Sequence, residues 1–237
     1  MFSISNALRK LFPDRFLRKV CYSQCGEDLV LAALMRQLGK TGPGFYLDVG
    51  AYHPFIGSNT YLFYRQGWRG INLDPRPGIM AQFNKFRPND INLEFGIGDK
   101  TELLCYYMLE SEPGLNTFNF ETLQAVGKEG LVTSTIDVPV ITLADVQQKH
   151  VPNGTIIDFV SIDTEGFEIK VLSTFDFSLH RPKVFALECN DVTTFDHLSC
   201  NDVDSFMRRN GYVPVAKNMI SLTVATVFYM DSTLVPG

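Results

Sequence analysis

Short apolar segments alternate with amphipathic segments along most of the chain, and this alternation limits the fold more than any other feature. The apolar segments are rich in β-branched and aromatic residues, as strands are, and they lie at residues 45–49, 70–73, 91–95, 157–162 and 184–188. Helices are predicted between them, near residues 26–38, 58–66, 77–86, 165–173 and 201–210. This pattern is typical of parallel βαβ units and predicts an α/β fold with helices on both faces of one sheet.

Two departures from the alternation carry further information. The predicted strands at 212–216 and 221–229 are joined by only four residues. They must be antiparallel, because a crossover connection needs about a dozen residues or more, so the otherwise parallel sheet is expected to contain an antiparallel last strand. An inserted β segment is also predicted near 103–140, where strands at 104–109 and 135–141 enclose a polar loop and are expected to cover the sheet.

Size and composition fit one domain spanning residues 21–237. The chain has 237 residues, of which 45% are hydrophobic and 20% charged, as in ordinary globular domains. Its net charge of −5 disfavours extensive binding to a phosphate backbone, so no nucleic-acid partner is expected. Residues 1–20 hold five basic residues against one acid. They are expected to form a basic helix or arm that either stays solvated or makes weak peripheral contact with an anionic membrane.

Two further features bear on the location of the protein. The longest apolar run, residues 29–35, is far shorter than the roughly 20 residues of a transmembrane helix, and residues 1–8 lack the basic start and apolar core of an export signal. We therefore expect a cytoplasmic protein. The five cysteines are scattered without a CxxC pair, which predicts neither a disulfide framework nor a zinc site.

Acidic residues stand at the ends of successive predicted strands. Asp48 and Gly50 end the first, Asp74 ends the second, and Asp99 follows the third. In an open α/β sheet these ends meet at the edge where ligands bind, and an acid on the second strand can accept hydrogen bonds from a ribose diol. A nucleoside site is therefore predicted, for a nicotinamide dinucleotide or for S-adenosylmethionine. Pyrophosphate binding is disfavoured, because the next glycine after Gly50 is Gly57 and the GxGxxG spacing is missing.

The most acidic part of the chain is a fourth strand end, where residues 158–168 contain four carboxylates. Asp163 falls at the carboxyl end of the predicted strand, over the expected ligand crevice. Glu165 and Glu168 have an alternative explanation, since acids at the start of a helix complement the helix dipole.

Four motifs, at residues 23–28, 47–51, 67–75 and 161–168, together resemble the FkbM family of methyltransferases, and the resemblance spans about residues 22–190. It implies a Rossmann-like seven-stranded methyltransferase sheet with an antiparallel last strand, S-adenosylmethionine as the cofactor and transfer of a methyl group to oxygen. The acceptor in this family is commonly a sugar or a polyketide-like metabolite, and bacterial relatives are often associated with surface-polysaccharide synthesis. The chain departs from the common pattern at residues 52–54 and in carrying Asp74 where a glutamate is usual.

The resemblance also places individual residues against the cofactor. These cofactor-binding residues are Gln24, Asp28, Asp48, Gly50, Ala51, Asp74 and Asp99. The first two would close over the cofactor, with Asp28 near its amino group, unless their helix only covers the sheet. Asp48, Gly50 and Ala51 would line the methionine and sulfonium end. Asp74 would hold the ribose, and Asp99 would lie near the adenine.

Transfer to a hydroxyl oxygen benefits from a general base, and three residues are candidates for this catalytic role. Asp163 has the expected position, Glu165 lies two residues further along, and His53 follows the first strand end. His53 can alternatively be a surface imidazole.

A metal site is an alternative way to activate the acceptor. Glu188 and Asn190 end the next predicted strand, beside Asp163. Two carboxylates and an amide oxygen suit Mg²⁺, and this layout resembles the metal site of catechol-type O-methyltransferases. A bound metal would lower the pKa of the acceptor hydroxyl directly.

The acceptor is expected to meet the inserted segment. Its candidate contact residues, which can equally pack the segment onto the sheet, are Tyr106, Tyr107, Asn116, Phe118 and Phe120. The sequence thus predicts an S-adenosylmethionine-dependent O-methyltransferase that acts on a saccharide or a related small metabolite. Two rivals stay open: a nicotinamide-dependent oxidoreductase and a non-catalytic scaffold of the same fold.

Overall fold

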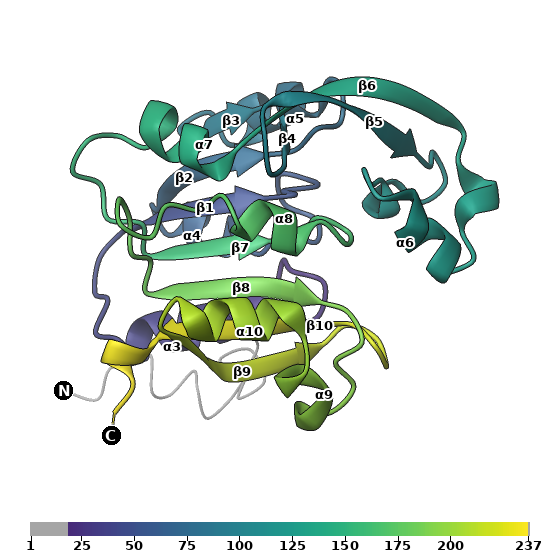
Figure 1. Cartoon of the computed structure of the whole chain (residues 1–237). Helices are drawn as coiled ribbons and strands as arrows, with labels where there is room; N and C mark the ends of the chain where they lie inside the picture. Colours follow the sequence, from purple (N-terminus) through teal and green to yellow (C-terminus); the bar gives the residue numbers. More distant parts are fainter. Residues whose placement is uncertain (1–18, 237) are drawn as a thin grey trace, which may run out of the picture.

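A seven-stranded sheet organises the computed structural model, which describes residues 19–236. The strands follow the order β3-β2-β1-β7-β8-β10-β9 across the sheet (Figure 1). Their bounds are β1 Phe45–Val49, β2 Arg69–Leu73, β3 Ile91–Leu93, β7 Phe159–Ile162, β8 Val184–Cys189, β9 Tyr212–Met219 and β10 Ala225–Asp231. The strands of the β3-β2-β1-β7-β8 run are parallel, whereas β10 is antiparallel to both β8 and β9. The predicted sheet with its antiparallel last strand is confirmed.

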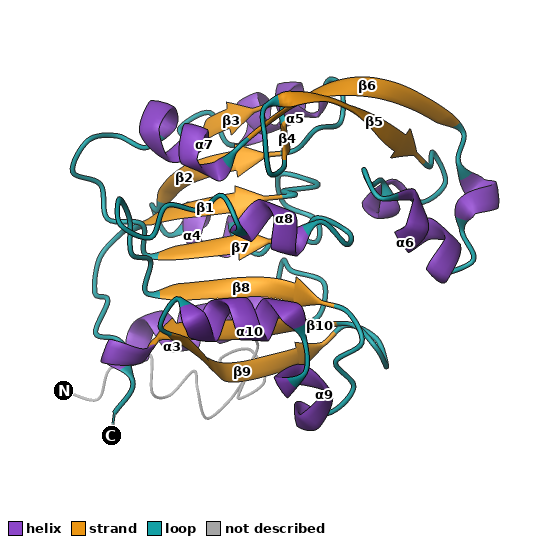
Figure 2. Cartoon of the chain, viewed as in Figure 1, coloured by secondary structure: helices purple, strands orange, loops and turns teal. Residues whose placement is uncertain are grey.

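Helices cover both faces of the sheet, as the alternation predicted (Figure 2). Their bounds are α3 Glu27–Gln37, α4 Tyr61–Arg65, α5 Ile79–Phe86, α7 Leu143–His150, α8 Glu168–Leu172, α9 Phe195–Ser199 and α10 Asp202–Arg209. Successive strand residues point to opposite faces. Tyr46 and Phe159 pack under α3 and α4, and their neighbours Leu47 and Val160 pack under α7, α8 and α10.

The inserted segment forms a second sheet of three strands in the order β4-β6-β5. Its elements are β4 Gly96–Ile97, β5 Glu102–Met108, the 3-10 turns Pro113–Leu115 and Glu129–Leu131, α6 Phe120–Ala125 and β6 Ser134–Ile141. This sheet and α6 project past the carboxyl ends of the main strands (Figure 1). The predicted insertion near 103–140 is confirmed, and it begins one short strand earlier.

Several predicted boundaries differ from the structure. The third strand ends at Leu93, because Gly96–Ile97 pairs with β6 in the second sheet. Helix α8 begins at Glu168 rather than at residue 165, since Glu165 and Gly166 have φ values of 53° and 92°, which no right-handed helix contains.

Helices α7 and α9 were not predicted; each begins after a threonine that caps it, Thr142 and Thr194. All but the last two residues of the basic segment 1–20 lie outside the described residues, so its helix and its membrane contact stay predictions. No described helix has the length and apolar character needed to cross a membrane.

Candidate active site

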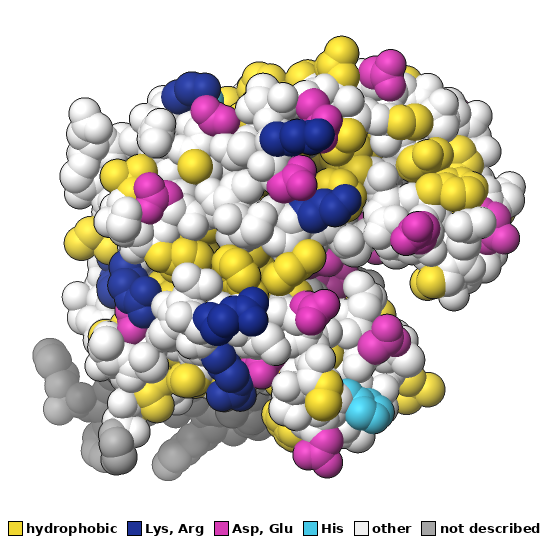
Figure 3. Space-filling view, viewed as in Figure 1, with side chains coloured by type: hydrophobic (Ala, Val, Ile, Leu, Met, Phe, Trp, Pro, Cys, Tyr) yellow, Lys and Arg dark blue, Asp and Glu magenta, His cyan; other side chains and the backbone are white. Residues whose placement is uncertain are grey.

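A cavity of about 820 Å³ opens where the ends of β1, β2 and β7 meet the inserted segment. Its lining includes Asp48, Asp74, Asp163 and Glu165 from the strand ends and Tyr106 of β5 from the inserted segment. In the space-filling view the molecule is hollowed between the inserted segment and the lower part of the sheet (Figure 3). The cavity therefore lies at the edge where parallel α/β sheets bind their ligands.

Gly50 allows the ends of β1 and β7 to touch. Its φ of 77° lies in the left-handed region, and a Cβ atom at this position would overlap the carbonyl oxygen of Asp163. The amides of Gly50 and Ala51 both donate to the carbonyl oxygen of Leu73 in β2. The glycine thus joins three strand ends at the floor of the cavity, a packing role beside the ligand contact that the sequence predicted.

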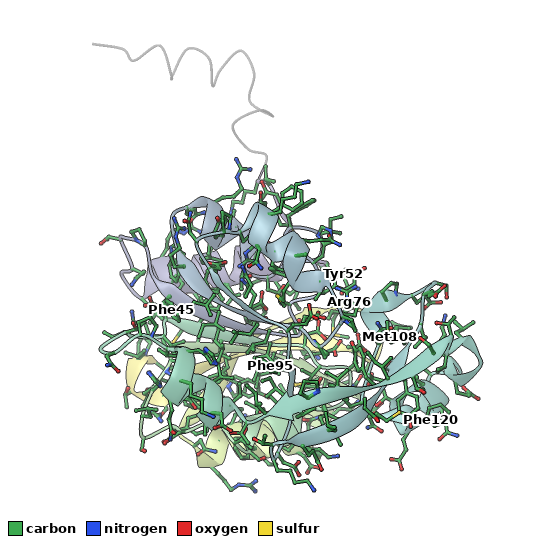
Figure 4. The ribbon with its side chains drawn as sticks, turned by 90° about the horizontal axis from the view of Figure 1, so that it is seen from above. Phe45, Tyr52, Arg76, Phe95, Met108 and Phe120 are labelled. Carbon is green, nitrogen blue, oxygen red and sulfur yellow. The ribbon has the colours of Figure 1, made fainter. Side chains whose placement is uncertain are left out.

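The end of β2 carries a fixed carboxylate. Asp74 is 5% exposed, and its two oxygens accept hydrogen bonds from the amides of Tyr52, at 2.8 Å, and Arg76, at 2.9 Å. The Arg76 guanidinium also contacts the Tyr52 carbonyl and lies over its ring, 4.9 Å from the ring centroid (Figure 4). Burial raises the pKa of Asp74, an effect that the positive charge of Arg76 opposes. The Arg76 Nε atom also lies 3.5 Å from Oδ1, so Oδ2, which accepts only the Tyr52 amide, keeps a lone pair that no described contact uses.

A buried arginine supports the acid at the end of β1. Arg87 is fully buried and donates to the hydroxyls of Tyr46 and Thr60, and the Thr60 hydroxyl donates to Asp48 at 2.5 Å. Burial raises the pKa of Asp48 to about 6, although the positive charge of Arg87 opposes this rise. The sequence analysis missed Arg87, because nothing in its local pattern distinguishes it from a solvated residue at a helix end.

The first of the four motifs, residues 23–28, lies partly at the cavity and partly at the start of α3. Gln24 lines the cavity, as expected, whereas Asp28 is fully buried away from it. The Asp28 carboxylate accepts hydrogen bonds from the Tyr22 amide, at 2.8 Å, and from the Ser23 hydroxyl, at 2.9 Å. Asp28 therefore fixes the turn that presents Gln24, and the structure gives it no direct contact with the cavity.

Two further predicted residues are not brought to the cavity. The Nδ1 atom of His53 accepts from the amides of Phe55 and Ile56, and burial lowers its pKa, as does the charge of Arg76. This ring stabilises the loop after β1 and is not among the described residues that line the cavity. Asp99 follows β4 in the second sheet and is exposed, because the chain leaves the main sheet at Leu93.

Three carboxylates converge at the ends of β7 and β8. Oxygens of Asp163, Glu165 and Glu188 all lie within 4.8 Å of one another. Burial raises the pKa of Asp163 to about 7, partly offset by a hydrogen bond with Glu188. Burial, with the charges of Asp163 and Glu168, raises the pKa of Glu165 to about 9, and the pKa of Glu188 lies well above its ordinary value for similar reasons. Burial and the mutual repulsion of the three carboxylates thus both disfavour their charged forms.

A tight turn aims Glu165 at this cluster. Glu168 accepts three hydrogen bonds at one oxygen, from the amide and hydroxyl of Thr164 and from the amide of Gly166. The Thr117 hydroxyl of the inserted segment donates to the Glu165 carbonyl at 3.0 Å. These contacts keep Glu165 in the left-handed conformation, which a non-glycine residue adopts only when its surroundings impose it.

The sequence predicted two of these three carboxylates as metal ligands. Asp163 and Glu188 do approach each other, and Glu165 is the third member of the cluster. Asn190 follows β8 and is not among the described residues that line the cavity; its carbonyl oxygen accepts from the side chain of Asn201.

The inserted segment contributes only part of its predicted acceptor face. Tyr106, Asn116 and Phe118 line the cavity. Tyr107 and Phe120 instead pack against each other, with ring centroids 4.9 Å apart. Adjacent residues of a strand point to opposite sides, so Tyr106 and Tyr107 cannot both face the cavity.

Comparison with solved structures finds methyltransferases of low sequence identity. The 1,6-didemethyltoxoflavin-N1-methyltransferase of Burkholderia thailandensis, bound to S-adenosylhomocysteine, has 14% identity and a TM-score of 0.46, covering 96% of this chain and 88% of that chain. A TehB-like SAM-dependent methyltransferase from Corynebacterium glutamicum has 10% identity and a TM-score of 0.46, covering 96% and 97%. Fibrillarin of Aeropyrum pernix, with natively bound S-adenosyl-L-methionine, has 11% identity and a TM-score of 0.42, covering 85% and 74%. A sequence search of curated proteins gives no significant match.

The family comparison is more extensive. Residues 48–214 match the family described as the methyltransferase FkbM domain. The match includes the ends of β1, β2, β7 and β8, and so most of the cavity floor. It agrees with the resemblance seen in the four motifs, and the chain belongs to the FkbM methyltransferase family.

Proposed function

We propose that this FkbM-family chain uses S-adenosylmethionine to methylate a hydroxyl oxygen of a saccharide or a related small metabolite. The observation that carries the proposal is the shared cavity at the strand ends, which is lined by Asp48, Asp74, Asp163 and Glu165. These acids suit a cationic nucleoside at the ends of β1 and β2 and a hydroxylated acceptor at the end of β7. The volume of about 820 Å³ is within the range of pockets that hold small ligands.

Each wall of the cavity has a proposed role. The Asp74 carboxylate, chiefly through Oδ2, would bind the ribose diol, and the carboxylate of Asp48 would face the positively charged end of the cofactor. Gly50, Ala51 and Gln24 would shape the remaining cofactor wall. Bound S-adenosylmethionine supplies an electrophilic methyl group.

On the acceptor side, Asp163 and Glu165 would contact the reacting hydroxyl. The enzyme must hold this oxygen about 3 Å from the methyl carbon and opposite the sulfur, so positioning supplies much of the rate. During methyl transfer, Asp163, whose pKa burial raises to about 7, would accept the hydroxyl proton in its deprotonated form. His53, the third catalytic candidate, would act only through the loop that it stabilises.

The nature of the acceptor rests on the wall formed by the inserted segment. Tyr106 and Phe118 offer aromatic rings and Asn116 an amide, groups that suit the apolar and hydroxylated faces of a sugar. Polysaccharide synthesis is proposed as the setting from the family resemblance. All five cysteines are free, which supports a reducing, cytoplasmic location.

Two binding experiments separate this proposal from its rivals. Calorimetric titration with S-adenosylhomocysteine is expected to give one site per chain, and titration with NAD⁺ is expected to give none. Incubation with isotopically labelled S-adenosylmethionine and a glycan pool should then add labelled methyl groups, located by mass spectrometry. NAD⁺ binding would favour the oxidoreductase, cofactor binding without turnover on any acceptor would favour the scaffold, and methylated RNA would replace the proposed acceptor class.

A substitution tests the ribose assignment. Asp74→Asn keeps the shape of the side chain but replaces an acceptor oxygen by a donor, so the affinity for S-adenosylhomocysteine should fall about tenfold or more, about 1.4 kcal/mol. Asp137→Asn, in an exposed part of β6, serves as the matched control and should bind like the parent. Equal affinities in the parent and Asp74→Asn would remove Asp74 from the cofactor site.

A further inference from the structure

The carboxylate cluster at the ends of β7 and β8 lacks a positive partner. None of the ion pairs among residues 19–236 includes Asp163, Glu165 or Glu188. The carboxylates of Glu168 and Glu27 also act electrostatically on this site and add to its negative charge. Several carboxylates so close together either hold protons or bind a cation.

Glu188 provides a second, independent observation at this cluster. This side chain is only 7% exposed, and its Oε2 atom has no hydrogen-bond partner among the described residues. It nevertheless extends toward Asp163 and Glu165, to within 4.8 Å. A buried acceptor without a partner destabilises the folded chain, and more so when it is charged. The orientation of Glu188 is explained if its free oxygen has a ligand in the cluster.

The spacing suits a small inorganic cation. Two oxygens on opposite sides of Mg²⁺ are about 4.1 Å apart, and on opposite sides of Ca²⁺ about 4.9 Å, so one cation can reach all three carboxylates. An organic ammonium group fits less well, because Asp163 and Glu165 line the cavity whereas Glu188 is not among the described residues that line it. Carboxylate oxygens are the ligands that such hard cations prefer.

We propose that Asp163, Glu165 and Glu188 bind one divalent cation of the Mg²⁺ class at the wall of the cavity. This set differs from the one read from the sequence, because Glu165 takes the place of Asn190. The proposal deepens the proposed function and rests on it, since the cation would lie where the acceptor hydroxyl is expected and would lower the pKa of that hydroxyl. The turn at Glu165, tied to Thr117 of the inserted segment, would then hold a metal ligand in place.

The test is direct binding of Mn²⁺ to the whole chain. Electron paramagnetic resonance measures the Mn²⁺ that stays free in solution, and Mg²⁺ is added as a competitor. We expect one Mn²⁺ per chain, displaced by Mg²⁺. Glu188→Gln and Asp163→Asn should each weaken Mn²⁺ binding by about tenfold or more, because each removes a charged ligand. Glu129→Gln, an exposed residue of the inserted segment, is the matched control and should bind like the parent.

Thermal unfolding distinguishes a variant that has lost the metal site from one that does not fold. Without metal, Glu188→Gln should melt at the parent temperature or above it, because the substitution removes a charge from an uncompensated cluster. Addition of Mn²⁺ should raise the melting temperature of the parent and of Glu129→Gln but not that of Glu188→Gln. If Glu188→Gln melts lower than the parent, Asp163→Asn decides the question by the same two measurements.

Titration with S-adenosylhomocysteine separates this inference from the proposed function. A parent chain that binds S-adenosylhomocysteine but no Mn²⁺ at about 1 mM overturns the cation site and leaves the methyltransferase proposal intact. Mn²⁺ binding that persists in both Glu188→Gln and Asp163→Asn places the ion elsewhere and overturns the assignment. Binding of Mn²⁺ without any binding of S-adenosylhomocysteine overturns the proposed function instead.

Discussion

At the scale of single residues, the site depends on one glycine that has no room for a side chain. Gly50 combines a left-handed φ with a backbone contact from Asp163. Either feature alone favours glycine, and together they exclude every other residue from this turn. The sequence showed that a glycine stood here, but the reason, contact with a strand more than 100 residues away, exists only in the folded chain.

Gly50→Ala is therefore expected to destabilise the fold by about 3 kcal/mol, combining left-handed strain with overpacking against Asp163. Gly78→Ala is the matched control, because Gly78 has nearly the same φ, 78°, and no atom lies within 4 Å of the position that its Cβ would take. The control should cost about 1 kcal/mol. Urea unfolding measures the free energy of unfolding of both variants. Equal losses in the two would show that the contact with Asp163 adds nothing to the cost of the substitution.

At the scale of elements, an ion pair joins the antiparallel end of the sheet. Arg181, just before β8, donates to Asp231 at the end of β10 at 2.6 Å, and it also donates to the carbonyl oxygens of Asn210 and Gly211 before β9. Burial raises the pKa of Asp231, but the hydrogen bonds from Arg181 and Thr233 outweigh burial, so the pKa is lowered overall.

This lowered pKa fixes the sign of a pH effect. A carboxyl with a lower pKa in the folded state stabilises the fold above its unfolded pKa, about 3.9, and loses this contribution as the pH falls through the folded value. Asp231→Asn should therefore melt below the parent at pH 7, and the two should converge as the pH falls below the lowered pKa of Asp231 in the folded state. Asp137→Asn, exposed and outside the ion pairs of residues 19–236, is the control. A constant difference across the whole range contradicts the assignment.

At the scale of the whole molecule, a buried ion-paired carboxylate and the cavity lie at opposite ends of the parallel strands. Asp158, 1% exposed, pairs with Lys40 at 2.8 Å and Lys183 at 2.6 Å, and accepts from the amide of Phe45 at 3.2 Å. It thereby ties together the amino ends of β1, β7 and β8. Phe45 lies far from Tyr52 and Arg76, which mark the cavity end (Figure 4).

Asp158→Ala should destabilise the chain by about 3 kcal/mol, because it leaves two lysines and an amide without their partner. The affinity for S-adenosylhomocysteine of the folded fraction should stay within about twofold, since distant sites act independently. Glu102→Gln breaks the exposed pair with Lys100 and should cost less than about 1 kcal/mol. Denaturant unfolding measures the stability of each variant, and calorimetry measures its affinity for S-adenosylhomocysteine. A large loss of affinity in Asp158→Ala would contradict the independence of the two ends of the strands.

The sequence by itself determined the strands of the main sheet, most of its covering helices, the inserted segment and the antiparallel last strand, because these depend on local periodicity and on connection length; it missed α7 and α9. It also identified Asp48, Asp74 and Asp163 as acids at strand ends, since the end of an apolar run is visible without a structure. Position in a motif, however, does not say which way a side chain turns.

Only the tertiary structure decided that Asp28 and His53 stabilise local turns, that Asp99 leaves the main sheet, and that Glu165 joins Asp163 and Glu188. It alone revealed that Arg87 supports Asp48 through Thr60. The physical reason is the range of the interactions. Periodicity acts over a few residues, whereas desolvation, charge clustering and the strained turn at Glu165 arise between segments that are distant in sequence and meet only when the sheet has formed.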